Sequence, residues 1–179
     1  MSSKNKAFTL VELLMVIAIT GLLVTFGVPV YNQTQRRAEF NNVVSNLVSM
    51  INQARNRAFA GEQVFDLGQN IEVAPAGGYG LEVDSSSERV VLFADLTDNS
   101  SFDKDVIVEE LMFPGGTEIK EIKEDAVVVN KTVFSFLLPM AKMRMNSGVS
   151  QVEIVIDSPS ASLTKTITIE KIKGFVEMN

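Results

Sequence analysis

The stretch at residues 8–30 reads FTLVELLMVIAITGLLVTFGVPV, and Glu12 is its only charged residue. As a helix it would extend about 35 Å, enough to cross the hydrocarbon core of a bilayer. A carboxylate inside such an apolar run is costly to bury, so its presence often marks a function. The stretch therefore predicts a membrane-embedded helix that carries one carboxylate near its N-terminal end.

The polar residues before this stretch, MSSKNKA at 1–7, carry Lys4 and Lys6. Because basic residues favour the cytoplasmic side, we expect this leader to face the cytoplasm, although Arg36 and Arg37 beyond the far end weaken the asymmetry. No small-residue cleavage site follows the apolar run, so a retained anchor fits better than a secretory signal peptide.

Glu12 has two interpretations from residue chemistry. In the first turn of a helix, a carboxylate is stabilised by the free N–H groups and the helix dipole. Alternatively, it awaits a cationic partner that arrives only when copies of the chain assemble. The residues alone leave both open.

The segment KAFTLVELL at residues 6–14 resembles the processing site of type IV prepilins and type II secretion pseudopilins. The resemblance implies that prepilin peptidase cuts between Ala7 and Phe8 and methylates the new amino group of Phe8. It also implies that Glu12 neutralises the amino terminus of an adjacent subunit during filament assembly. Ala7 stands where this family usually has glycine, so we expect slower cleavage.

Residues 31–61 continue the helix in amphipathic form. Apolar residues recur there at steps of three and four, which is typical of a helix lying on a core: Phe40, Val43, Val44, Leu47, Val48, Ile51, Ala54 and Ala58. Gly61 is the expected C-cap. Gly21, Gly27 and Pro29 predict a weakened, kinked join at about residues 25–29.

Residues 62–179 change to the alternating pattern of strands. Strands are expected at 79–83, 89–94, 106–113, around 119–122, and at 132–138, 151–157 and 163–172. The predicted fold class is α+β: a long N-terminal helix, with a transmembrane half and an amphipathic half, packed on a mostly antiparallel β headpiece.

The composition excludes several function classes. The chain has no His and no Cys, which removes histidine bases, cysteine nucleophiles, disulfides and the common zinc sites. No hydroxyl or carboxylate is arranged as a nucleophile with its base, so we expect no enzymatic activity. The net charge of −6 disfavours a nucleic-acid binder.

An acidic loop at residues 95–105 is a candidate Ca²⁺ site, with Asp95, Asp98, Asp103 and Asp105 as ligands. Its spacing does not fit an EF-hand, and a solvated acidic turn is the favoured interpretation. No other cofactor is expected.

Basic residues at 142–145 and at Lys165, Lys171 and Lys173 are the place where a DNA-binding face would lie. Interspersed acidic residues favour an ordinary solvated surface.

The headpiece is similar to that of GspH/FimT-like minor pseudopilins at residues 77–81, 92–95 and 174–176. The resemblance implies a minor pilin or pseudopilin of a type IV pilus or type II secretion pseudopilus, acting in initiation or at the tip. It implies a single-pass inner-membrane stage with the headpiece outside, then a filament. The implied partners are other subunits, prepilin peptidase, the inner-membrane assembly platform and, before assembly, membrane lipid.

Three alternatives to this interpretation stay open: a tip subunit that binds DNA, Ca²⁺ or a surface, a major pilin, and an anchored envelope protein that is never processed.

Overall fold

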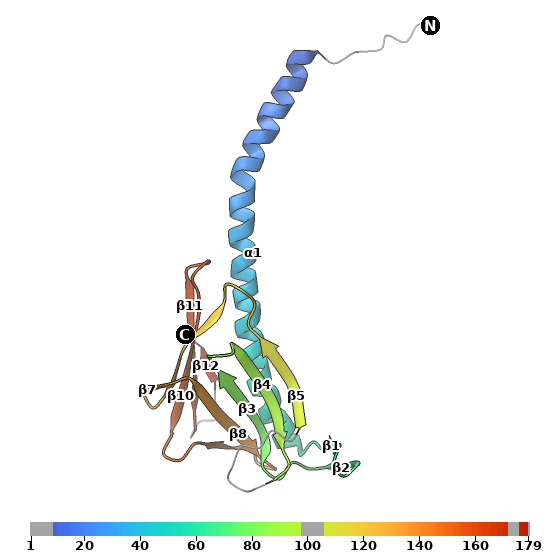
Figure 1. Cartoon of the computed structure of the whole chain (residues 1–179), viewed down its shortest axis with the longest axis vertical. Helices are drawn as coiled ribbons and strands as arrows, with labels where there is room; N and C mark the ends of the chain where they lie inside the picture. The colour runs from blue at the N-terminus through green and yellow to red at the C-terminus, as the bar shows by residue number, and fades with distance from the viewer. Residues whose placement is uncertain (1–8, 98–105, 172–175, 179) are drawn as a thin grey trace, which may run out of the picture.

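The computed structural model describes residues 9–97, 106–171 and 176–178, without the side chains of residues 26–30 and 176–178. One helix, α1 (Leu10–Ala60), runs from the N-terminal end into the headpiece (Figure 1). Gly61 ends it in the left-handed conformation at φ 64°, with its amide donating to carbonyl groups of the last turn. This confirms the predicted C-cap, since glycine adopts positive φ without strain.

The helix assignment of α1 is continuous through Gly21, Gly27 and Pro29, and Figure 1 shows a gently curved helix. The predicted weakening of the join therefore does not appear as a break in the helix. Within the ranges described above, no helix is long and apolar enough to cross a membrane. The transmembrane half was expected at residues 8–30. Of this stretch, Phe8 and the side chains of residues 26–30 are not among the described parts of the chain.

The described residues of the headpiece form two five-stranded sheets and one short hairpin, and all pairings among them are antiparallel. The first sheet has the order β5-β4-β3-β8-β9, with β3 (Gly78–Asp84), β4 (Arg89–Asp95), β5 (Val106–Met112), β8 (Lys131–Leu137) and β9 (Lys142–Met145). The second has the order β12-β11-β10-β6-β7, with β6 (Glu118–Glu124), β7 (Val127–Val129), β10 (Gln151–Ser158), β11 (Leu163–Glu170) and β12 (Val176–Met178). The hairpin pairs β1 (Val64–Asp66) with β2 (Ile71–Val73). This confirms the α+β prediction.

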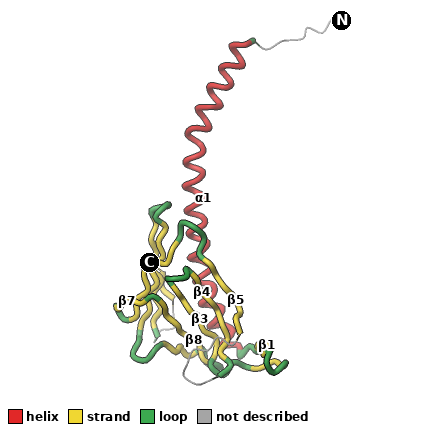
Figure 2. The backbone as a smooth tube through the Cα atoms, in the orientation of Figure 1, coloured by secondary structure: helices red, strands yellow, loops and turns green. Residues whose placement is uncertain are grey.

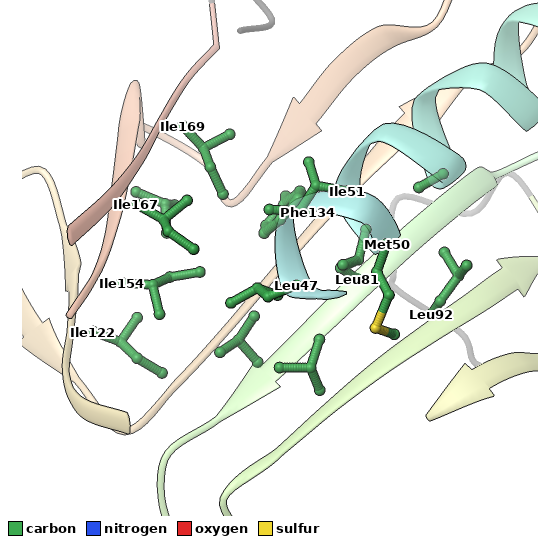
Figure 3. Close-up of a cluster of buried hydrophobic side chains, with 14 of the residues drawn as sticks. Leu47, Met50, Ile51, Leu81, Leu92, Ile122, Phe134, Ile154, Ile167 and Ile169 are labelled. Atoms are coloured by element: carbon green, nitrogen blue, oxygen red, sulfur yellow. The ribbon is translucent and has the colours of Figure 1, made fainter. Parts of the chain in front are cut away.

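The core lies where the apolar stripe of α1 meets both sheets. Leu47 and Ile51 of the helix, fully or almost fully buried, belong to one cluster with Phe134 of the first sheet and with Ile154 and Ile167 of the second (Figure 3). Because the stripe repeats at the helical period, a single face of α1 supplies its apolar contacts over several turns. The N-terminal half contributes none of the buried residues and extends away from the headpiece (Figure 2).

The residues at 142–145, which were predicted as a small basic patch, form the edge strand β9. Met143 and Met145 are buried in the core opposite Phe136 and Phe134, so only alternate residues of this segment face outward. A strand of four residues carries too little alternation to be recognised from sequence.

Candidate assembly site at the N-terminal end of α1

The first four turns of α1 expose an apolar surface on all sides. Every large hydrophobic residue described in this stretch is more than half exposed, from 54% at Ile19 to 75% at Leu10. An exposed apolar surface of this size is typical of a segment that contacts lipid or other helices.

Thr9 and Glu12 form a reciprocal capping box at the start of α1. The amide and the hydroxyl of Thr9 donate to Oε2 of Glu12 at 2.9 and 3.0 Å, and the amide of Glu12 donates to the Thr9 hydroxyl at 3.3 Å. Glu12 therefore satisfies the free N-terminal donors of its own helix. Both bonds to the carboxylate use Oε2, and among the described residues none reaches Oε1.

Farther along the apolar surface, Val16, Ile17, Thr20, Gly21 and Val24 line a shallow apolar groove. Nothing lies within 4 Å of the position where a Cβ on Gly21 would stand. The Thr20 hydroxyl donates to the carbonyl of Val16 at 2.6 Å, so its polar group is satisfied inside the helix. The groove thus offers an apolar depression with no unpaired polar group.

The predicted processing residues, Ala7 and Phe8, lie outside the described residues, so cleavage and methylation stay predictions. Gly27 and Pro29 are described only by their helical backbone. Of the sites predicted for this end of the chain, Glu12 is the one whose side-chain geometry is visible.

Asp95, one of the four candidate Ca²⁺ ligands, is the buried end of an ion pair. Its Oδ2 lies 2.9 Å from Nη2 of Arg144, and its Oδ1 accepts from the amide of Thr97 at 3.1 Å. Burial raises the pKa of Asp95, while the bonds from Thr97 and Arg144 oppose that rise.

The other three candidate Ca²⁺ ligands, Asp98, Asp103 and Asp105, lie outside the described residues. Within the described part, no group of acidic residues could hold a metal ion. The Ca²⁺ site stays a prediction.

The ion pair of Arg144 was missed by the sequence analysis, which placed this residue in a solvated basic patch. Its Nε donates to the Ser135 hydroxyl at 3.1 Å, and its Nη2 reaches Asp95 on β4. The pair connects the edge strand β9 to the end of β4, although β8 and β3 lie between these two strands in the sheet. Only the alternation of Arg144 with two methionines hinted that the segment was a strand.

Comparison with known proteins finds a family match at this same end of the chain. Residues 2–28 match the family model described as the prokaryotic N-terminal methylation motif. The chain is 28% identical over 86 residues to the type IV major pilin protein PilA of Myxococcus xanthus (strain DK1622), covering 47% of this chain and 39% of that protein. It is 44% identical over 45 residues to the type IV major fimbrial protein FimA of Dichelobacter nodosus, covering 25% of this chain and 28% of that one.

These matches span well under half the length of either relative, and no solved structure matches the chain. The GspH/FimT-like subgroup inferred from the headpiece is not confirmed by them. The chain is therefore similar to type IV pilin proteins in its N-terminal methylation motif and over part of the length of two relatives.

Proposed function

We propose that this chain is a structural subunit of a pilus-like filament, held together by the N-terminal half of α1. The observation that carries the proposal is the exposed apolar surface of Leu10–Val24, which begins at the Thr9–Glu12 capping box and overlaps the methylation motif. In a filament, neighbouring helices would bury this surface while the headpieces cover the outside. The two relatives, named as major pilin and major fimbrial proteins, support this class of function.

Before assembly, the subunit would stand in the inner membrane with residues 8–30 in the bilayer, the leader in the cytoplasm and the headpiece outside. Prepilin peptidase would remove residues 1–7 and methylate Phe8. An inner-membrane assembly platform would then move the subunit into the filament. The methylation motif at 2–28 supports the processing step.

Glu12 would join two subunits in the filament by pairing with the amino group of Phe8 on a neighbour. The capping box leaves Oε1 without a described partner, so the carboxylate can keep its cap and still accept a cation. Pairing would remove two opposite charges from an apolar environment at once and would fix the axial register between helices.

The subunit could be a minor one at the tip of the filament or a major one along its length. The headpiece resemblance to GspH/FimT-like proteins supports a minor subunit at the tip or in initiation, of either a type IV pilus or a secretion pseudopilus. The names of the two relatives, a major pilin protein and a major fimbrial protein, favour a major subunit instead. A tip subunit that binds DNA, Ca²⁺ or a surface is the remaining candidate, with DNA disfavoured by the net charge of −6.

Mass spectrometry of the mature N-terminus, in cells with and without prepilin peptidase, tests the processing step. We expect a chain starting with N-methyl-Phe8 only when the peptidase is present, and more complete cleavage in the Ala7→Gly variant. Intact Met1 in both strains would overturn the filament proposal.

Two substitutions at Glu12 separate its roles. Glutamine can replace glutamate in a capping box, so E12Q keeps the helix cap but removes the charge. E12L removes both. If the charge pair drives assembly, both variants lose filament incorporation while processing stays normal, and the matched surface variant Val11→Leu keeps it. Normal incorporation of E12Q would refute the pairing role.

A further inference from the structure

A polar cavity lies where α1 leaves the headpiece, away from the assembly surface. Three separate segments line it: Arg36 and Glu39 of α1, the turn at 115–117 after β5, and Ser158 at the end of β10 with Ser160 just beyond it. Figure 1 shows both connections beside α1, at the end of the headpiece nearer the N-terminus. The cavity therefore lies at the end of the headpiece that the proposed membrane stage places nearest to the bilayer.

The floor of this cavity is built from buried polar groups. Ser158 is 1% exposed and donates to the carbonyl of Gly116 at 2.7 Å, which ties the two connections together. The amide of Thr117 donates to the carbonyl of Pro114 at 3.1 Å and closes a turn in which Gly116 has φ +95°. That φ favours glycine, so the turn has a defined shape before any ligand arrives.

Several donors in the cavity remain unused by the described residues. The amides of Gly115 and Gly116 and the hydroxyl of Thr117, a residue only 4% exposed, have no described acceptor. Arg36 is in none of the ion pairs found among the described residues. Amides of a turn, a hydroxyl and a guanidinium together are the groups that bind phosphate oxygens in proteins.

Glu39 gives the cavity a negative group beside this donor set. Its Oε1 accepts from the Gln35 amide at 2.9 Å, and no described donor reaches Oε2. With Arg36, the cavity carries one formal charge of each sign. A ligand that holds a phosphate and an ammonium group matches this pair better than a free anion does.

We propose that the cavity binds the headgroup of a phospholipid with a primary ammonium while the subunit stands in the membrane. The phosphate would contact Arg36 and the turn at 115–117, and the ammonium would contact Glu39. Arg36 lies six residues beyond Val30, about 9 Å along the helix. The headgroup layer is about 5–8 Å thick on each side of the bilayer, so Arg36 lies just beyond its outer edge. Side chains of a helix lean toward its N-terminal end, so the long Arg36 side chain can reach back to the headgroups. The inference rests on the membrane stage of the proposed function.

Native mass spectrometry of the full chain in a neutral detergent tests this binding. The probes are phosphatidylethanolamine, phosphatidylcholine and phosphatidylglycerol with identical acyl chains, and inorganic phosphate alone. We expect phosphatidylethanolamine to be retained best, because choline cannot donate hydrogen bonds to Glu39 and glycerol carries no cation. R36Q should weaken its retention about tenfold, the effect of losing one charge-assisted contact.

Arg37 is the matched control, because it is exposed, carries the same charge and does not line the cavity. R37Q should retain the lipid like the natural chain, and E39Q should bind phosphatidylethanolamine and phosphatidylcholine equally. Equal losses in R36Q and R37Q, or no ranking among headgroups, would overturn the site. Headgroup-selective binding by a chain whose Met1 stays intact in cells would refute the filament proposal and leave this site standing.

Discussion

Replacing Arg144 by glutamine should strongly destabilise the headpiece at neutral pH. Its Nη2 lies 2.9 Å from Oδ2 of Asp95, whose side chain is 0% exposed, whereas that of Arg144 is 17% exposed. R144Q leaves a buried carboxylate with Thr97 as its remaining described partner. Breaking a buried ion pair costs about 3–5 kcal/mol, and the solvent contact of Arg144 places the expected loss of unfolding free energy near 3 kcal/mol, at the lower end.

The loss in R144Q should depend on pH with a definite sign. Burial already raises the pKa of Asp95 above its unfolded value. Removing Arg144 takes away its hydrogen bond and its positive charge, both of which lower that pKa. For such a group, stability is greatest below the unfolded pKa and is lost as the pH rises through the folded pKa. The deficit of R144Q should therefore shrink as the pH falls from 7 toward about 4, near the usual aspartate value.

Urea unfolding of the full chain in mild detergent measures these effects. The chain has no Trp and two Tyr, so the Tyr31→Phe background leaves the fluorescence of buried Tyr79 as a reporter of the headpiece. Adding Asp95→Asn to R144Q removes the stranded charge and should recover part of the loss. A loss below about 1 kcal/mol for R144Q, or no recovery in the double variant, would refute the buried-charge argument.

Two further predictions concern single contacts in the headpiece. A Cβ on Gly80 would collide with the ring of Phe93, so G80A should lower the urea midpoint by an amount equivalent to about 1–3 kcal/mol. At Gly115 a Cβ would meet no atom within 4 Å, so the control variant G115A should leave the midpoint unchanged. Bonds from the hydroxyl and amide of Ser150 lower the pKa of Asp125, so its contribution is present above the unfolded pKa and is lost as the pH falls through the folded pKa. D125N should flatten the acid-side decline in the urea midpoint, and identical pH profiles for both chains would contradict this.

The parts of the fold that sequence predicted are those with long periodic patterns. The buried stripe of α1 extends over several turns, and the seven-residue strands β3 and β4 lie within one residue of the predicted ranges. The hairpin strands β1 and β2 and the edge strand β7 have three residues each, too few for a period to be detected. Their formation depends on the neighbouring strand rather than on their own pattern.

The functional-site residues also differ in how far apart they lie in the sequence, and this decides which of them could be predicted. Thr9 and Glu12 are three residues apart, so the first turn of a helix brings them together and sequence could place Glu12 there. Asp95 and Arg144 are 49 residues apart and meet only through the strand order β4-β3-β8-β9. The cavity near Arg36 likewise requires the folded arrangement of both sheets around α1.

The division of α1 into an exposed and a buried half would allow the proposed assembly to occur without refolding. The core is complete from Phe40 onward, so the free energy of the headpiece does not depend on the apolar surface of the first turns. That surface remains available for neighbouring helices. A Glu12 pairing that used Oε2 would disrupt the cap and lose about 0.5–2 kcal/mol of helix stability at the joint. A pairing through Oε1 would avoid this loss, and the cap that orders the free subunit would then also orient the carboxylate for the proposed filament.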